Sequence, residues 1–269
     1  MTRPITVLKL GGELLESHPK AMAIAPAIGE LAGEGPLVVV HGGGKDIDAE
    51  VARRGLQKQT VDGLRITDAD TLDAVVAAVA GTVNTRLVAA LAAHGVPGVG
   101  LTGADAVVVH ATRARQHRAV DGRLVDLGLV GEPTDAAPPR LIGDLLSHGY
   151  VPVLACLGCT EEGTVLNINA DTLASTLARV LRAPRLIVAG ATRGVLDADG
   201  STIDALDPPT LAAMIADGRA SAGMVAKLRA CRAAFAAGVA VTIVDGRDVL
   251  SFHTAPGTRL VDPAAPPAV

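Results

Sequence analysis

The feature that most constrains the fold is an alternation between short apolar runs and longer segments with helical periodicity. The apolar runs are typical of β-strands and lie at 5–10, 37–40, 98–101, 151–157, 185–190 and 239–244. The helical patterns lie at 20–33, 45–54, 69–93, 138–148, 207–217 and 224–237, with one more beginning near Asn169. This order predicts an α/β fold with a mainly parallel sheet that helices cover on both faces.

Composition indicates a core built from aliphatic side chains. Of the 269 residues, 49% are hydrophobic but only 1% are aromatic, which suits helices packed on buried strands. The alternation stops between Asp105 and Glu132, where β-like runs flank the turn dipeptide Asp121-Gly122. We therefore expect a hairpin inserted into the alternating pattern.

Charge and cysteine usage argue against several classes of protein. A formal charge of −4 without a basic block in the sequence disfavours a general nucleic-acid binder. Three cysteines are too few for a disulfide scaffold and favour a reducing compartment. The sequence shows no secretory leader, and its most apolar stretch, 74–83, is too short to cross a bilayer. We expect a soluble, cytoplasmic protein with neither a nucleic-acid nor a membrane partner.

Two glycine-rich loops follow neighbouring predicted strands. KLGG occupies 9–12 and HGGG occupies 41–44, and in both the glycines allow backbone N–H groups to converge on an oxyanion. The second loop leads into a helix, whose N-terminus favours negative charge. Neither loop has the spacing of a Walker A or dinucleotide-binding motif. The alternative interpretation is that the glycines only form tight turns.

Lys9 is a charged residue inside an apolar strand. Burying an unpaired ammonium group is unfavourable, so Lys9 either extends along its aliphatic stem to solvent or meets an anion. The two glycines that follow it favour the anion.

Six motifs in a fixed order carry a family resemblance. They are KLGG at 9–12, HGGG at 41–44, DGLRITDADTLD at 62–73, DLGLVGE at 126–132, LNINADTLA at 166–174 and GMVAKL at 223–228. Together they resemble the amino acid kinase family, and GLRIT, DLGLVGE and NINAD most resemble its acetylglutamate branch. The resemblance runs from Lys9 to about Arg259. It implies ATP-dependent phosphorylation of the γ-carboxylate of N-acetyl-L-glutamate, a step in arginine biosynthesis.

The resemblance also implies an architecture and a set of site residues. The family fold is a two-lobed, three-layer αβα sandwich, with acceptor binding and dimerisation expected in residues 1–174 and ATP binding in residues 175–269. By resemblance, Lys9 and Lys227 stabilise the transferring phosphoryl group, and Asp171 holds both lysines. N–H contacts to phosphoryl or acceptor oxygens are implied for Gly11, Gly12, Gly43 and Gly44, and acceptor α-carboxylate contacts for Arg65 and Asn167. Nucleotide contacts are implied within 191–196 and 219–227, with Thr192, Gly194, Val195, Leu196, Gly223, Met224 and Lys227.

These residue types suit phosphoryl transfer to a carboxylate. The acceptor is already ionised at neutral pH and needs no general base, so positioning and charge neutralisation are sufficient. Lysines, glycine N–H groups and Mg²⁺ carried by the nucleotide supply both, and we expect no metal ligand from the protein. Arg65 offers a planar fork for bidentate binding of a carboxylate. Structural roles remain open: Asp171 also suits a helix N-terminus, Asn167 a turn, and Arg65 or Lys227 a solvated surface.

Two departures from the resembled kinases leave selectivity open. Ala191 replaces an acidic residue near the nucleotide, and Ala104 replaces a lysine near the acceptor. The pair Cys156 and Cys159 has no second pair for a zinc site and lies at a strand end, so we interpret both as ordinary thiols.

Two other functions and an oligomeric state are also considered. A related kinase of lysine biosynthesis phosphorylates aminoadipate or glutamate on an acidic carrier protein, and basic residues between Arg113 and Arg123 could form such a docking surface. A non-catalytic amino-acid or nucleotide sensor is the other alternative. Because only eight residues precede Lys9, too few for the extra helix of arginine-inhibited members, we expect a homodimer insensitive to arginine.

Overall fold

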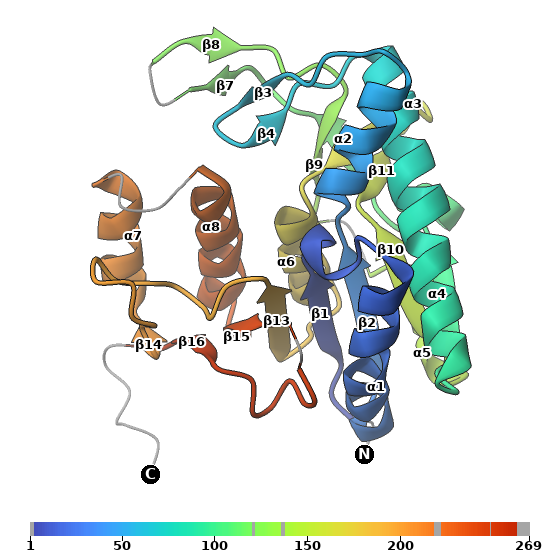
Figure 1. The fold of residues 1–269 in the computed structure, drawn as a ribbon, viewed down its shortest axis with the longest axis vertical. Helices are drawn as coiled ribbons and strands as arrows, with labels where there is room; N and C mark the ends of the chain where they lie inside the picture. The colour runs from blue at the N-terminus through green and yellow to red at the C-terminus, as the bar shows by residue number, and fades with distance from the viewer. Residues whose placement is uncertain (1–2, 120–121, 136–137, 218–221, 248, 263–269) are drawn as a thin grey trace.

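The computed structural model of the protein describes residues 3–119, 122–135, 138–217, 222–247 and 249–262. Its central sheet contains β1 (Thr6–Leu10), β2 (Leu37–His41), β5 (Gly98–Leu101), β10 (Val151–Ala155), β13 (Arg185–Gly190), β14 (Ala205–Leu206), β15 (Ala240–Asp245) and β16 (Gly257–Leu260). The strand order is β14-β16-β15-β13-β1-β2-β10-β5 (Figure 1). Every neighbouring pair is parallel except β15 and β16, which are antiparallel. The predicted α/β class with a mainly parallel sheet is confirmed.

Helices pack on both faces of this sheet. They are α1 (His18–Glu34), α2 (Gly44–Arg53), α3 (Ala69–Val76), α4 (Asn84–Ala93), α5 (Arg140–Ser147), α6 (Ala170–Val180), α7 (Pro208–Ala216) and α8 (Ala222–Ala236). Successive β1 side chains enter different cores, as the strand period of two requires. Leu8 packs with α1 and α4, whereas Val7 belongs to the core of α2, α3, α6, α7 and α8. The protein is therefore an αβα sandwich.

A smaller sheet and two hairpins lie beyond the carboxyl edge of the central strands (Figure 1). The small sheet has the order β11 (Leu157–Cys159), β12 (Val165–Ile168), β9 (Val130–Pro133), β6 (Ala111–Arg113). One hairpin pairs β3 (Thr60–Val61) with β4 (Leu64–Arg65), and the other pairs β7 (His117–Arg118) with β8 (Leu124–Val125). The second is the predicted insertion, although its turn residue Asp121 lies outside the described residues.

The first of the β-like runs predicted before the Asp121-Gly122 turn is VVVHATRA at 107–114, and the strand that it forms is shorter than this run. Asp105 accepts hydrogen bonds from the backbone and hydroxyl of Thr102 at 2.6 and 2.8 Å, which fixes a turn ahead of the 3₁₀ helix η3 (Asp105–Val107). Ala106 and Val107 adopt positive φ angles of 47° and 51°. A strand cannot pass through that geometry, so β6 starts only at Ala111.

The long apolar helix predicted at 69–93 contains a π-helical segment, η2 (Ala77–Val83), between α3 and α4. The 25-residue stretch Ala69–Ala93 is long and apolar enough to cross a membrane by length and composition alone. Half of its most apolar window is buried within the fold, and α4 packs against α1. We interpret it as a core helix.

The sheet register brings the glycine loops together. Leu10 pairs with His41 on β2 and with Ala189 on β13, so the carboxyl ends of these strands meet at one edge, where parallel sheets bind ligands. The division into residues 1–174 and 175–269 stays a prediction, and its boundary falls inside α6.

Candidate active site

The two glycine loops are in backbone contact. A Cβ placed on Gly12 would lie 2.8 Å from the Gly44 nitrogen and 2.9 Å from the Gly43 Cα, so a side chain at Gly12 would separate the loops. Helix α2 begins at Gly44 with Gly43 as its N-cap, and the N–H groups of a helical first turn have no partner within the helix. The loops therefore present donors suited to an anion.

Lys9 projects from β1 into a buried ion pair. Its Nζ lies 2.9 Å from Oδ1 of Asp171, and the two residues are only 6% and 9% exposed. Asn169 caps α6 by accepting hydrogen bonds from the backbone of Asp171 and Thr172 at 3.0 and 3.1 Å, which orients the carboxylate. Burial alone would lower the pKa of Lys9, but Asp171 raises it above its ordinary value of 10.5. Lys9 is therefore a cation at neutral pH.

A cavity of about 320 Å³, here called the central cavity, connects this ion pair to the glycine loops. Of the predicted site residues, Lys9, Gly12, Gly43, Gly44, Arg65, Asn167 and Asp171 line it. They come from four of the sequence motifs, those at 9–12, 41–44, 62–73 and 166–174. These four motifs thus meet in one space.

Arg65 lies in the central cavity with one half of its guanidinium already paired. Its Nη2 forms an ion pair with Asp48, whereas its buried Nη1 has no hydrogen-bond partner in the described part of the chain. Lys58 also contacts Asp48, at 2.8 Å. Burial would raise the pKa of Asp48, but the hydrogen bonds from Lys58 and Arg65 lower it below its ordinary value. The unpaired Nη1 is a donor for an anionic ligand.

Asn167 is linked to the same wall of the central cavity. Its side-chain nitrogen donates to the hydroxyl of Thr67 at 3.2 Å, and that hydroxyl donates to the Arg65 carbonyl at 3.2 Å. Sequence reasoning missed Asp48 as the partner of Arg65. Its position one helical turn after Gly44, on the same face of α2, was the available signal.

Beneath the HGGG loop lies a buried polar network that the sequence did not predict. His41 is fully buried, and burial lowers its pKa to about 4, so its imidazole is neutral. Its Nδ1 lies 3.1 Å from the carbonyl of Gly42, and its Nε2 accepts from Asn84, which also donates to the Val153 carbonyl at 2.9 Å. These contacts link the HGGG loop to Asn84 and to the β10 backbone.

Lys227 approaches the site from α8 but does not line the central cavity. A Cβ on Gly190 would lie 3.2 Å from the Lys227 Nζ, which locates the ammonium group at the end of β13. Among the described residues, no ion pair joins Lys227 to Asp171. Asp171, Lys227 and Lys9 all act on the buried thiol of Cys231, whose pKa is raised to about 12 chiefly by burial. The two lysines thus share one neighbourhood, but only Lys9 contacts Asp171.

The other predicted nucleotide residues also lie outside the central cavity. The Val195 N–H donates to Thr258 Oγ1 at 2.8 Å, and the buried Thr192 hydroxyl has no partner in the described residues. Leu196 is 42% exposed. Gly223 is exposed and Met224 half-buried at the start of α8, whereas residues 219–221 lie outside the described part. Gly194 adjoins Thr258.

The cysteines are free and buried. Burial raises the pKa of Cys156 to about 11, so its thiol is protonated at neutral pH. No three His, Cys, Asp or Glu side chains in the described segments lie together as a potential metal site.

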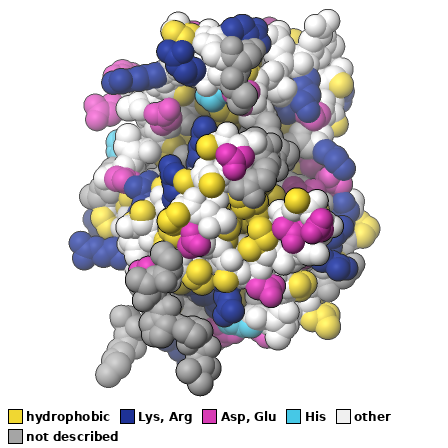
Figure 2. All heavy atoms as spheres, turned by 90° about the vertical axis from the view of Figure 1, so that its left-hand side faces the viewer, with side chains coloured by type: hydrophobic (Ala, Val, Ile, Leu, Met, Phe, Trp, Pro, Cys, Tyr) yellow, Lys and Arg dark blue, Asp and Glu magenta, His cyan; other side chains and the backbone are white. Residues whose placement is uncertain are grey.

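Two basic residues of the inserted hairpin region have acidic partners. Arg113 lies 3.4 Å from Asp126, and His117 lies 2.8 Å from Asp62. Figure 2 shows basic and acidic side chains intermixed on the face that includes this region. A docking surface for an acidic carrier protein therefore gains no support here.

Comparisons with known proteins identify the family and the fold. The amino acid kinase family profile matches residues 4–245. An acetylglutamate kinase of Anaeromyxobacter sp. (strain Fw109-5) is 42% identical over 248 residues, covering 90% of each chain. N-acetylglutamate synthase from Neisseria gonorrhoeae, solved with coenzyme A and N-acetyl-glutamate, superposes with a TM-score of 0.81 at 26% identity over 98% of this chain. This chain spans only 61% of that synthase. Carbamate kinase from Giardia, at 16% identity and TM-score 0.68 over 97% of this chain and 99% of its own, shares the fold.

Proposed function

This chain belongs to the amino acid kinase family, and from that premise we propose that it transfers the γ-phosphoryl group of ATP to the γ-carboxylate of N-acetyl-L-glutamate. The observation that carries the proposal is the central cavity, in which Lys9, the glycine loops and the half-paired Arg65 meet. The named acetylglutamate kinase relative supports this acceptor.

In this proposal the acceptor lies between Arg65 and Lys9. Its α-carboxylate takes the free Nη1 of Arg65, and Asn167 adds a polar contact. Its γ-carboxylate points toward Gly12 and Gly44, where backbone donors and Lys9 face the phosphoryl group. The attacking oxygen is ionised at neutral pH, so the step requires no general base. Asp171 keeps Lys9 charged and oriented, and acts through that lysine.

Lys227 and the segments around Thr192 and Met224 would hold the nucleotide. Transfer between two anions is slowed by charge repulsion, so preorganised cations and N–H groups supply most of the rate enhancement. Mg²⁺ carried by the ATP phosphates would add charge neutralisation. Since Mg²⁺ in kinases is bound mainly through substrate phosphates, the cation would enter the site with the nucleotide.

The remaining expectations follow the same family logic. Residues 1–174 would bind the acceptor and form a homodimer, and residues 175–269 would bind ATP. The reaction would serve arginine biosynthesis in the cytoplasm.

The proposal is tested by trapping the acyl phosphate with hydroxylamine. Purified protein, ATP and Mg²⁺ are incubated with N-acetyl-L-glutamate, glutamate, aspartate or carrier-bound aminoadipate. We expect hydroxamate only with N-acetyl-L-glutamate, at a rate matched by ADP release. Hydroxamate only with the carrier-bound substrate would replace this function with the lysine-pathway reaction.

A further inference from the structure

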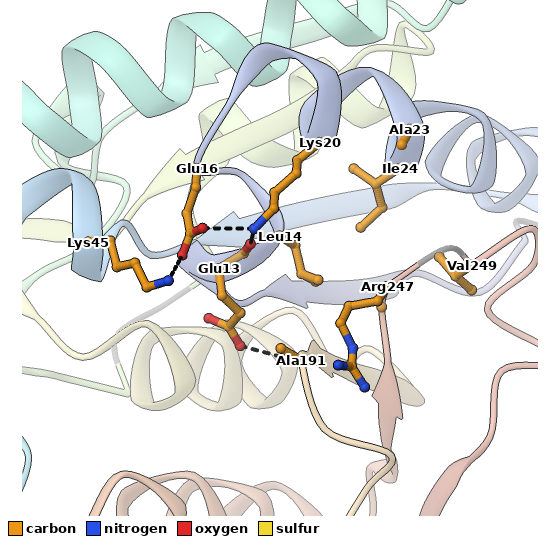
Figure 3. Close-up of a pocket in the computed structure, with 11 residues that line it drawn as sticks. Glu13, Leu14, Glu16, Lys20, Ala23, Ile24, Lys45, Ala191, Arg247 and Val249 are labelled. Carbon is orange, nitrogen blue, oxygen red and sulfur yellow. Dashed lines mark hydrogen bonds and ion pairs between the residues drawn. The ribbon is translucent and has the colours of Figure 1, made fainter.

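Glu13 is a half-buried carboxylate beside the groups proposed to handle the nucleotide. It lies in the 3₁₀ helix η1 (Gly12–Leu14), directly after the KLGG motif. Figure 3 shows its side chain pointing away from Glu16 and toward the end of β13, where a hydrogen bond joins it to Ala191. It also lines a side cavity of about 350 Å³ that is distinct from the central cavity.

The Glu13 carboxylate takes the space that a side chain at Gly11 would need. A Cβ on Gly11 would lie 2.6 Å from Oε2 of Glu13. The absence of a side chain at Gly11 therefore allows the Glu13 carboxylate to lie against the KLGG loop.

The side chains of Glu13 and Lys227 both lie beside Gly190 at the end of β13. A Cβ on Gly190 would lie 3.2 Å from Glu13 Oε1 and 3.2 Å from Lys227 Nζ. The carboxylate oxygen and the ammonium nitrogen are therefore separated by at most twice this distance. Burial lowers the pKa of Lys9, whereas Asp171 and, to a smaller degree, the charge of Glu13 raise it. Glu13 thus supplies negative charge next to both lysines.

Within the described part of the chain, one oxygen of this carboxylate has a hydrogen-bond partner and the other has none. Oε1 accepts from the Ala191 N–H at 3.1 Å. Oε2 forms no hydrogen bond or ion pair with the described residues. A carboxylate in this position repels phosphate oxygens, because like charges a few ångströms apart interact unfavourably in a partly screened site. The same carboxylate favours a divalent cation, since Mg²⁺ in kinases is bound by one or two carboxylates together with substrate phosphates.

We propose that Glu13 makes the nucleotide site select metal-bound over metal-free ATP. Its carboxylate disfavours metal-free ATP and contacts the divalent cation that ATP carries. This inference rests on the proposed function, since it requires ATP phosphates near Lys9 and Lys227. Glu13 contacts Ala191, and Ala191 is the position at which the resembled kinases carry an acidic residue. Glu13 therefore supplies an acidic group next to the position that lacks one.

The test is calorimetric binding of ATP with Mg²⁺ and with EDTA, which needs no turnover. Glu13→Gln keeps an oxygen to accept the Ala191 N–H but removes the charge. For Glu13→Gln we expect the dissociation constant of metal-free ATP, divided by that of Mg²⁺-bound ATP, to fall about tenfold relative to the unmodified protein. Glu13→Ala also removes the hydrogen bond to Ala191 and should lower this ratio to a similar degree.

Glu16→Gln is the matched control. Glu16 belongs to the same segment but pairs with Lys20 and Lys45 at 2.7 and 2.9 Å, away from Gly190, so the ratio should stay unchanged. An unchanged ratio in both Glu13 variants, with normal MgATP binding by the unmodified protein, would overturn this inference alone. Failure of the unmodified protein to bind MgATP would overturn the proposed function and this inference with it.

Discussion

The Lys9–Asp171 pair makes a prediction about stability that can be worked out from its burial. Asp171→Asn removes the negative partner of a buried ammonium group. Breaking one side of a buried ion pair typically destabilises a protein by about 3–5 kcal/mol, because an uncompensated charge remains. An upper limit also exists, since Lys9 can escape the penalty by losing its proton. Deprotonating a lysine with the ordinary pKa of 10.5 at pH 7 requires about 5 kcal/mol, at about 1.4 kcal/mol per pH unit. The destabilisation caused by the unpaired charge cannot exceed this value.

Between pH 7 and 10 the unfolding free energy should be flat in the unmodified protein and should rise with pH in the variant. In the unmodified protein the pKa of Lys9 is raised in the folded state, so the stability from the pair is fully present below pH 10.5 and is lost only as pH rises through the folded value. In Asp171→Asn, burial is left as the main influence and lowers the folded pKa of Lys9 below the unfolded one. The unfolded chain then binds more protons, and stability rises with pH between 7 and 10.

Urea denaturation at pH 7, 8, 9 and 10, followed by far-ultraviolet circular dichroism, measures this. The control is Asp144→Asn, which breaks the solvent-exposed pair of Arg140 and Asp144 at 3.5 Å and should leave the unfolding free energy unchanged within error. A profile for Asp171→Asn that is flat in pH and within about 1 kcal/mol of the unmodified protein would refute the buried pair as described.

Three further predictions concern activity. Lys227→Met should lower turnover by about 100- to 1,000-fold with little change in the thermal midpoint, because the described residues give Lys227 no ion pair; a large stability loss would indicate a structural role. Arg65→Lys should raise the KM for N-acetyl-L-glutamate by about 10- to 100-fold and leave the KM for ATP unchanged in steady-state assays, whereas equal effects on both would contradict acceptor binding. Gly12→Ala places a Cβ 2.8 Å from the Gly44 nitrogen and should reduce turnover about 100-fold by displacing the loops. Normal turnover in this variant would show that loop contact is dispensable.

The parts of the fold that sequence predicts well are those with a strong local period. Strands such as β1 and β13 and helices such as α1 follow the predicted ranges because their apolar spacing matches one geometry. The strand predicted over 107–114 starts only at Ala111 because the turn set by Asp105 overrides β propensity at the beginning of the run. The π-helical turn within 69–93 has no distinctive apolar period.

The candidate site divides in the same way. Lys9 and the glycines were predicted because the loops follow adjacent parallel strands, which places them together. Asp48, Asn84 and Glu13 were missed because their roles depend on tertiary neighbours: Arg65 for the first, His41 for the second, and the end of β13 for the third.

The central claim is that a carboxylate oxygen of the acceptor attacks the γ-phosphorus directly. N-acetyl-L-glutamate labelled with ¹⁸O in its γ-carboxylate tests this when the acyl phosphate is cleaved by hydroxylamine at its carbonyl carbon. The bridging oxygen then leaves with phosphate, so we predict one ¹⁸O atom in the phosphate released, seen as an isotope shift in its ³¹P resonance. Phosphate without ¹⁸O would mean that water, and not the acceptor, takes the phosphoryl group.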